Sequence, residues 1–409
     1  MNMKTIKTQS VMKKYLLIAA TAVVAMAACS KVETFDNTPT KAINFTVVNH
    51  LQQVKATAGL TYPTSVPFGS FAWWTENDWT GVAADQAYVF MDNQEVSWHS
   101  IETGAPEVWA PTLPYYWTKT GKITFASYSP YTADGTDNGY SEVPEYDVTK
   151  GFLFKDYTIV SATDVDLMYA NLAANCTQNT NVDGTAVTDS SNPEGGYAGV
   201  PTIFNHALCQ LGFQFRAIGQ KNPNVDRVVI DVTDVDILNI DNKGSFTQIP
   251  VAPATVKWTT DHANATADYE YAPDETMHLE LIESTTANLA STTNYTALGK
   301  TRILLPQALL NSNDALDTTT DQVLVVKYTI KTKYSNVTLT DENAAGYWAT
   351  ESVESTVRLR NGNIAAWADN QNITYRISIN PYTTAITFDP AIVDWTDVFS
   401  DDIEITPNE

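Results

Sequence analysis

Positively charged residues are scarce in this chain of 409 residues. Lysine and arginine number 24 against 47 aspartates and glutamates, which gives a formal net charge of −23 at pH 7. A chain this acidic repels phosphate backbones, so we expect no nucleic-acid partner. No arginine precedes Arg216.

Catalytic and metal-binding motifs are missing as well. The sequence contains no Gly-x-Ser-x-Gly elbow, no Walker loop and no His-Glu-x-x-His. The five histidines are scattered, and none pairs with another at the spacing of metal ligands. A hydrolase would need two carboxyl groups facing one cleft, about 5–10 Å apart. We predict a protein that is not an enzyme, with no catalytic residue, no cofactor and no metal.

Cysteine is rare, with three residues in the chain: Cys29, Cys176 and Cys209. An exported chain can join two cysteines in a disulfide. Cys209, however, alternates in register with Leu211 and Phe213, which predicts a buried strand face, whereas Cys176 lies in a polar stretch. We therefore favour free thiols at both positions. The nearby His206 is expected to be a hydrogen-bonded residue of the core or its rim.

The N-terminus has the pattern of an export signal. Lys13 and Lys14 precede an apolar run at residues 15–26, which ends in Ala27-Ala28-Cys29. The run is shorter than the roughly 20 residues that a membrane span needs. Cys29 after small residues resembles a bacterial lipobox, with Met26 where leucine is usual. We predict a signal peptide at residues 1–28 and a lipid on Cys29.

Alternation of apolar and polar residues dominates the rest of the chain and predicts an all-β fold. A polar loop at residues 175–196 predicts a domain boundary near residue 200. A further strand leads from Val228 to an expected hairpin turn at residues 241–244. The alternating apolar positions are Ile43, Phe45 and Val47; Ile123 and Phe125; Met277, Leu279 and Leu281; Leu324, Val326, Tyr328 and Ile330; and Ile373, Tyr375, Ile377 and Ile379.

Six tryptophans fall close together, at positions 73, 74, 79, 98, 109 and 117. Large aromatic side chains ordinarily fill the core between two sheets, which is the interpretation that we favour. Exposed indole rings can instead stack on sugars. Trp73 and Trp74 are adjacent, so on a strand they point to opposite faces and one of them can be exposed.

Several short segments together resemble the fimbrillin superfamily of Bacteroidales lipoproteins, whose members build or decorate type V pili. The lipobox at Cys29 is followed, in order along the chain, by matching segments. These are KAINF at 41–45, KAT at 55–57, YYWTKTGKITF at 115–125, ASYSP at 126–130, DLMYA at 166–170, FNHALCQL at 204–211, LLPQ at 304–307, ITFDP at 386–390 and VDW at 393–395.

The resemblance implies two transthyretin-like β-sandwich domains in tandem, at residues 56–199 and 200–409. A lipidated segment at residues 29–55 would precede them and carry a removable first strand with Ile43, Phe45 and Val47. In pilus-forming relatives, a protease cuts after a basic residue and removes this strand. The best-known relatives are cut after arginine, whereas the candidates here are Lys55, which we prefer because it lies past the strand, and Lys41.

The resemblance further implies that a neighbouring subunit refills the vacated groove, usually with its C-terminal segment. The candidate donor strand lies at residues 392–409 and contains Trp395, Val398, Ile403 and Ile405. Ile403 and Ile405 share one face, as a donor strand requires. The alternative is that this tail pairs within its own domain.

Together these expectations describe a structural subunit of a cell-surface pilus, located at the bacterial outer membrane and serving adhesion. Its expected partners are other pilin subunits, ligands on host or bacterial surfaces, and the outer membrane through the lipid before processing. Two alternatives stay open. One is a glycan-binding surface lipoprotein that uses exposed tryptophans, and the other is a permanently lipidated anchor or accessory subunit whose first strand is never cut.

Overall fold

The structure is a computed structural model that describes most of the chain after residue 40. It covers residues 41–49, 62–79, 86–148, 150–160, 165–177, 199–248, 257–310, 316–360, 364–383 and 386–394. Strands dominate these residues, and the one described helix is the short α2 (Thr286–Ala290). The all-β prediction is therefore confirmed. No described helix is long and apolar enough to cross a membrane.

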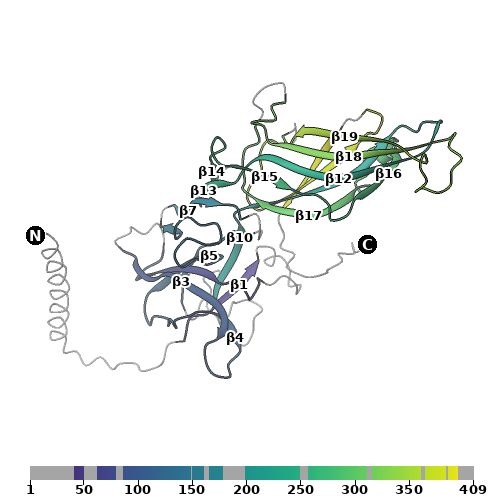
Figure 1. Cartoon of the computed structure of the whole chain (residues 1–409). Coiled ribbons are helices and arrows are strands. Elements are labelled where there is room, and N and C mark those ends of the chain that lie inside the picture. The colour runs from purple at the N-terminus through teal and green to yellow at the C-terminus, as the bar shows by residue number, and fades with distance from the viewer. Residues whose placement is uncertain are drawn as a thin grey trace, which may run out of the picture. The chain divides into compact units, whose positions relative to one another are not determined.

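The first sheet closes on itself. Its strand order is β2-β3-β4-β1-β10-β8-β5-β9, and β2 also pairs with β5, so all of these strands except β9 form a ring. Figure 1 labels β1, β3, β4, β5 and β10 of this sheet. The strands are β1 (Phe45–Asn49), β2 (Phe68–Thr75), β3 (Tyr88–Ser100), β4 (Glu107–Pro111), β5 (Lys122–Ser129), β8 (Met168–Ala170), β9 (Ala173–Cys176) and β10 (Val200–His206).

The alternation along β5 explains how this sheet packs on both faces. Ile123 and Phe125 belong to one buried cluster, which also contains Phe45, whereas Ala126 and Tyr128 belong to a second buried cluster. Successive side chains on a strand point to opposite faces, so one strand contributes to both clusters. We call the first cluster the ring core.

A small four-stranded sheet joins early and late parts of the chain, in the order β14-β13-β7-β6. Its strands are β6 (Glu145–Asp147), β7 (Gly151–Thr158), β13 (Lys243–Thr247) and β14 (Trp258–Thr260). The hairpin turn expected at residues 241–244 is wrong. Asn242 lies between two strands of different sheets, and β13 pairs with β7 and β14. Gly244 allows β13 and β14 to approach each other closely, because a Cβ there would lie 2.9 Å from the Thr259 carbonyl oxygen.

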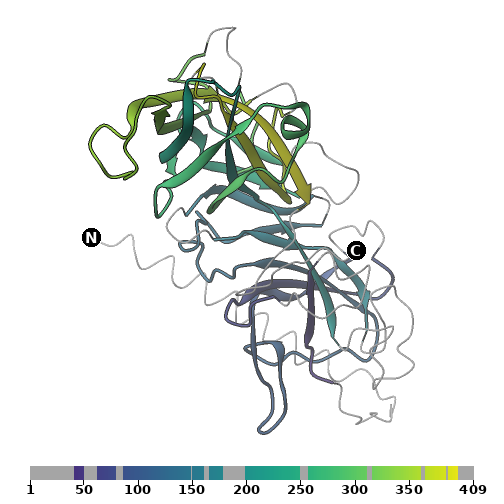
Figure 2. The same ribbon diagram turned by 90° about the vertical axis from the view of Figure 1, so that its right-hand side faces the viewer.

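The remaining strands form a nine-stranded sheet in the order β19-β18-β12-β16-β11-β20-β21, with β15 beside β12 and β17 beside β11 (Figure 2). Its strands are β11 (Cys209–Gly219), β12 (Val225–Asp241), β15 (Thr266–Glu270), β16 (Met277–Glu283), β17 (Thr296–Leu304), β18 (Val323–Tyr334), β19 (Ala349–Arg358), β20 (Gln371–Ile379) and β21 (Ile386–Asp394).

The predicted apolar faces of this sheet are buried. Ile373, Tyr375, Ile377 and Ile379 on β20 are fully inaccessible, and Leu324, Val326, Tyr328 and Ile330 on β18 are at most 5% exposed. Met277 and Leu279 on β16 are buried, and Leu281 is partly buried. Period-2 alternation therefore located these strands and their inward faces correctly.

The segment after residue 200 begins in the ring and not in the second sheet. β10 pairs with β1 and β8, and the nine-stranded sheet starts with β11. His206, at the end of β10, is buried and shares a 2.7 Å hydrogen bond between its Nδ1 and Oδ2 of Asp166, as expected of a core residue. Cys176 and Cys209 are both buried free thiols, one on β9 and the other on β11.

Candidate subunit-assembly site

β1 completes the ring by lying between β4 and β10. All five of its residues pair in parallel with β10, from Phe45 opposite Val200 to Asn49 opposite Phe204. On the other side, Phe45 is opposite Trp109 of β4. Without β1, the edges of β4 and β10 that pair with it would be left open.

The residues just before β1 extend this closure. The amide of Ile43 donates to the Tyr115 carbonyl at 2.8 Å, and the Trp117 amide donates to the Lys41 carbonyl at 3.0 Å. On the β10 side, the Val200 amide donates to the Asn44 carbonyl at 2.8 Å. Residues 41–49 therefore satisfy backbone donors and acceptors on both sides, which would otherwise be unpaired.

Two side chains of this segment fill the ring core. Ile43 is 1% exposed and Phe45 is 4% exposed, while Val47 is partly buried against the same cluster. The Phe45 ring meets Phe68 and Phe125 edge to face, with centroids 5.4 and 5.6 Å apart. Full burial of one such side chain stabilises the folded protein by roughly 1.5–3 kcal/mol. The same groove would offer this free energy to any strand that replaced β1.

The walls of the groove are aromatic. Tyr62 stacks on Phe204 with centroids 5.1 Å apart and meets Trp109 at 5.3 Å. The Tyr62 hydroxyl shares a 2.5 Å hydrogen bond with Ser129, and burial raises the pKa of Tyr62 above its usual range. Of these wall residues, Trp109 falls in the tryptophan cluster and Phe204 in the segment at 204–211 noted from the sequence, whereas Tyr62 and Phe68 were not predicted. Phe204 sits on β10, whose partner β1 is distant in sequence.

Gly199 allows the start of β10 to approach the segment before β1. A Cβ at Gly199 would lie 2.6 Å from Asn44 Oδ1 and 2.7 Å from the Asn44 carbonyl oxygen. Both distances are shorter than any ordinary carbon contact, so a larger residue would displace the strand. The sequence offers one signal for this position, a glycine immediately before an apolar strand.

The two candidate cleavage sites have different consequences. Lys41 is exposed and is the first described residue, so a cut after it would leave Ile43 and Phe45 attached to the mature chain. Lys55 lies outside the described residues, as do Cys29 and the expected signal peptide. Because β1 ends at Asn49, only a cut after Lys55 would free the whole strand.

The candidate donor strand is described in part. Its first residues, 392–394, end β21 and pair with β20 in the chain's own sheet, where Ile392 lies opposite Ile373 and Asp394 opposite Gln371. Trp395, Val398, Ile403 and Ile405 lie outside the described residues. β21 is an edge strand in the described sheet order.

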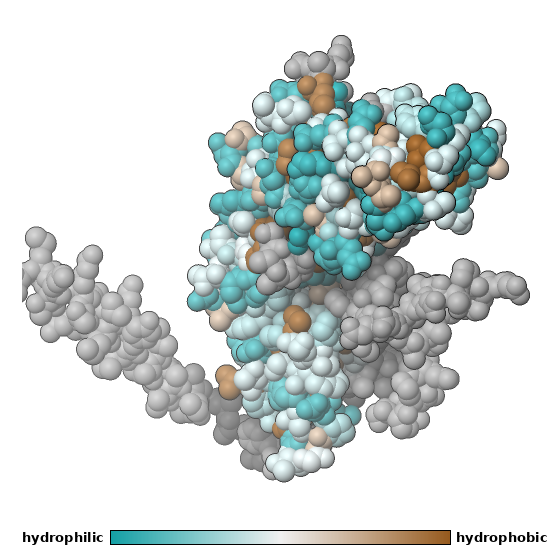
Figure 3. All heavy atoms as spheres, turned by 45° about the vertical axis from the view of Figure 1, so that its right-hand side comes forward, coloured by the Kyte–Doolittle hydropathy of each residue, from teal (hydrophilic) through white to brown (hydrophobic). Residues whose placement is uncertain are grey.

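The tryptophans divide between core and surface. Trp73, Trp109 and Trp117 are buried, Trp74 and Trp79 are partly buried, and Trp98 is 37% exposed. Trp73 packs with Trp79 and Tyr146 in the second cluster, whereas Trp74 packs against the ring core. The adjacent pair therefore points to opposite faces, as predicted. On the face shown in Figure 3, hydrophobic residues form scattered spots among hydrophilic ones.

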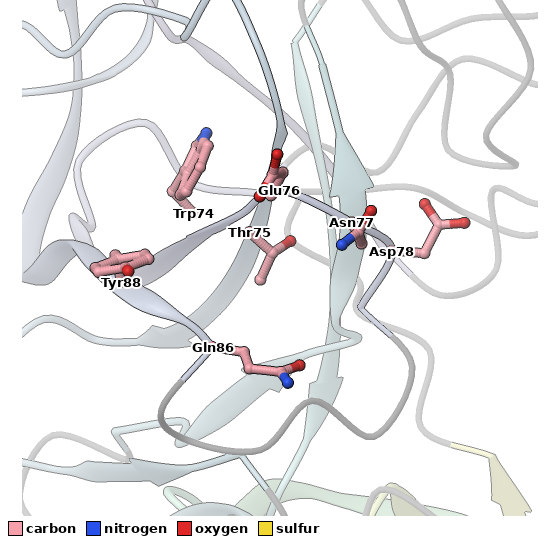
Figure 4. A pocket seen from close by; sticks show the side chains of 7 residues that line it. All are labelled: Trp74, Thr75, Glu76, Asn77, Asp78, Gln86 and Tyr88. Carbon is pink, nitrogen blue, oxygen red and sulfur yellow. The ribbon is translucent and has the colours of Figure 1, made fainter.

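Trp74 also borders a surface hollow of about 600 Å³. We call it the Trp74 hollow, and Figure 4 shows its lining side chains. They are Trp74, Thr75, Glu76, Asn77, Asp78, Gln86 and Tyr88. Trp74 and Tyr88 are cross-strand partners on β2 and β3, which a sequence alone does not pair. Among the described residues, no group of histidine, cysteine and acidic side chains is arranged to hold a metal ion.

The comparison with protein families decides where the chain belongs. A profile of the fimbrillin-like family matches residues 65–395, which is most of the chain. The chain belongs to the fimbrillin-like family. Fimbrillin-family proteins are structural or adhesion proteins of the cell surface and are not enzymes, so this fimbrillin-like chain is a non-enzymatic protein of that kind.

One solved structure supports the fold. A fimbrial protein from Bacteroides vulgatus is similar with a TM-score of 0.54 at 18% identity, over 87% of this chain and 99% of that one. The tip fimbrial protein Mfa3 from Porphyromonas gingivalis, truncated at its C-terminus, is matched with a TM-score of 0.30 at 10% identity, over 81% and 94%. The second likeness is too distant to support an argument. No curated protein sequence matches this fimbrillin-like chain.

Proposed function

We propose that this protein is a structural subunit of a cell-surface pilus that assembles by strand exchange. One observation carries the proposal: β1 closes the ring near the N-terminal end of the described chain, and Phe45 on β1 and Ile43 just before it are buried in the ring core. A strand in this position can be removed by one cut beyond its end. The remaining groove would then present unpaired backbone groups and apolar pockets.

The physical logic favours refilling by another subunit. An extended segment that enters the groove restores the backbone hydrogen bonds of β4 and β10 and covers the exposed aromatic walls. We propose that the donor is the C-terminal segment at residues 392–409 of a neighbouring subunit, which contains Trp395, Val398, Ile403 and Ile405. Ile403 and Ile405 share one face and would be inserted together. The neighbouring subunits in the pilus would be copies of this protein or pilins of a related type.

The export route belongs to the same proposal. Residues 1–28 would be the signal peptide, and the lipid on Cys29 would hold the precursor at the outer membrane until the cut after Lys55. We further propose that the chain forms two transthyretin-like β-sandwich domains, divided a few residues after the predicted boundary near residue 200, because β10 belongs to the ring and the second large sheet starts with β11. If Lys55 is never cut, the protein instead stays a lipidated anchor or accessory subunit with its groove filled.

Limited digestion with a lysine-cleaving protease tests the mechanism. We expect the purified precursor to form filaments after digestion, as seen by electron microscopy, and the Lys55→Gln variant to stay monomeric. Lys41→Gln is the matched control and should form filaments like the wild type. A chain truncated after Asp394 should be cut normally and yet fail to polymerise. Filaments from Lys55→Gln at the wild-type level would contradict the proposal.

A further inference from the structure

The Trp74 hollow lies at one end of the ring core. Trp74 is on the same face of β2 as Ala72, whose side chain is buried in that core, and the indole itself is partly buried against it. The mouths of β-barrels are frequent ligand sites, and a volume of about 600 Å³ falls in the usual range for such sites. None of the described residues that line the hollow belongs to β1 or to the aromatic walls of its groove.

The aromatic pair in this hollow is held in a fixed arrangement. Trp74 and Tyr88 have ring centroids 5.7 Å apart with an interplanar angle of 49°. The indole Nε1 donates to the Thr120 carbonyl at 2.8 Å. Gly121, with φ of +75°, leaves space for the indole, because a Cβ there would lie 2.4 Å from Nε1. The ring is therefore preorganised, which lowers the cost of binding a ligand against it.

Tyr88 gives the pair its exposed surface. Its side chain is 64% exposed, so most of its ring is accessible to a ligand. A flat apolar surface beside polar groups suits a ligand that has both an apolar face and hydroxyl groups. Sugars have this character, because the C–H groups of a pyranose ring form one face and the hydroxyls project from the rim.

The polar side chains of the hollow indicate which ligand charge it would accept. Glu76, Asn77, Asp78 and Gln86 are exposed and also line the hollow, with Glu76 next to Trp74 and the others farther from the aromatic pair, as Figure 4 shows. Carboxylates accept hydrogen bonds from hydroxyls, and side-chain amides both donate and accept them. The described residues of the lining include no cationic side chain, and the nearby Lys122 forms an ion pair with Asp78. Among these described residues, an anionic ligand would meet only negative and neutral groups.

We propose that the Trp74 hollow binds a neutral sugar residue of a surface glycan. Trp74 and Tyr88 stack on the face of the sugar ring, while Glu76, Asp78 and Gln86 bind its hydroxyls. The proposal needs neither the cut after Lys55 nor strand exchange, so it concerns the unassembled chain as much as a filament. It gives the adhesive role of a fimbrillin-like protein a specific ligand class.

The test uses the unassembled full-length mature protein and an array of neutral oligosaccharides, with the sialylated forms of the same oligosaccharides beside them. We expect binding to a subset of the neutral glycans and weaker binding to their sialylated forms. Titration calorimetry with the best neutral glycan should show at least about tenfold weaker binding for Trp74→Ala and for Tyr88→Ala. Tyr88 is largely exposed, so its variant keeps the fold even if Trp74→Ala loses stability.

Trp98→Ala is the matched control. Trp98 is also a partly exposed tryptophan with a bonded indole, whose Nε1 donates to Glu107 Oε2 at 2.8 Å, but it lies outside the hollow. Its variant should bind like the wild type. The proposal is overturned if no neutral glycan binds, if Trp98→Ala weakens binding as much as Tyr88→Ala, or if sialylated forms bind better. A second assay measures binding to a cell surface before and after enzymatic removal of its glycans. Binding that survives this removal would indicate a protein ligand and would also overturn the proposal.

Discussion

Phe45→Ala is the perturbation that most sharply tests the role of β1 in the ring core. Phe45 is 4% exposed and meets two aromatic rings edge to face. Truncation of a buried phenylalanine to alanine costs about 3–5 kcal/mol, from lost transfer free energy and the cavity that remains. The loss of two aromatic contacts places the expected cost in the upper part of this range.

The assay is urea unfolding of the unprocessed protein, followed by tryptophan fluorescence and extrapolated to water. Val47→Ala is the graded comparison, because its partly buried side chain should cost roughly 1 kcal/mol. Thr46→Ala changes a neighbouring side chain outside the ring core and should cost less than about 1 kcal/mol. A cost below about 1 kcal/mol for Phe45→Ala would refute the reasoning.

Processing adds a second expectation to the same variant. After a cut behind Lys55, the segment that carries Phe45 leaves the chain, so filaments of wild type and Phe45→Ala should have the same stability. The precursor and the filament should thus respond differently to one substitution. A filament that is weakened by Phe45→Ala would show that the strand is retained.

Two further predictions concern other parts of the structure. Gly199→Ala should lower the stability of the precursor by about 1–3 kcal/mol, because the new methyl group would overlap Asn44; an unchanged midpoint in urea would exclude this contact. At Asp231, burial acts to raise the pKa, but the ion pair with Lys331 at 2.5 Å and the hydrogen bond with His278 at 2.6 Å outweigh it and hold the pKa below its usual range. Its contribution to stability is therefore present at neutral pH and lost as the pH falls below about 4, so Asp231→Asn should flatten the acid side of a stability profile, and a profile parallel to the wild type would contradict this.

Local pattern predicted the strands of this fold well, because alternation reports which face of a strand is buried. The apolar positions of β18 and β20 are buried as expected, and so are Ile43 and Phe45 before and on β1. The pairing of these strands was not predictable. β1 lies beside β10, more than 150 residues further along the chain, and nothing local specifies that partner.

Turn-type residues do not form a turn at one place, for a physical reason. Asn242 and Gly244 have the composition of a hairpin turn, yet the chain continues into another sheet, where Phe246 is buried among aromatic side chains. Long-range burial outweighed local turn preference. The Trp74 hollow could be predicted in part, since the opposite orientations of Trp73 and Trp74 follow from strand geometry. Its partner Tyr88 became apparent only through cross-strand register.

The central claim is that β1 is removed before assembly, and the N-terminal sequence of the protein in native surface filaments tests it most directly. Strand exchange predicts that the chain begins at Ala56, directly after Lys55, and that Ile43 and Phe45 are absent. An intact, acylated Cys29 at the N-terminus of the filament-borne chain would contradict the claim, and the protein would then be a permanently anchored subunit.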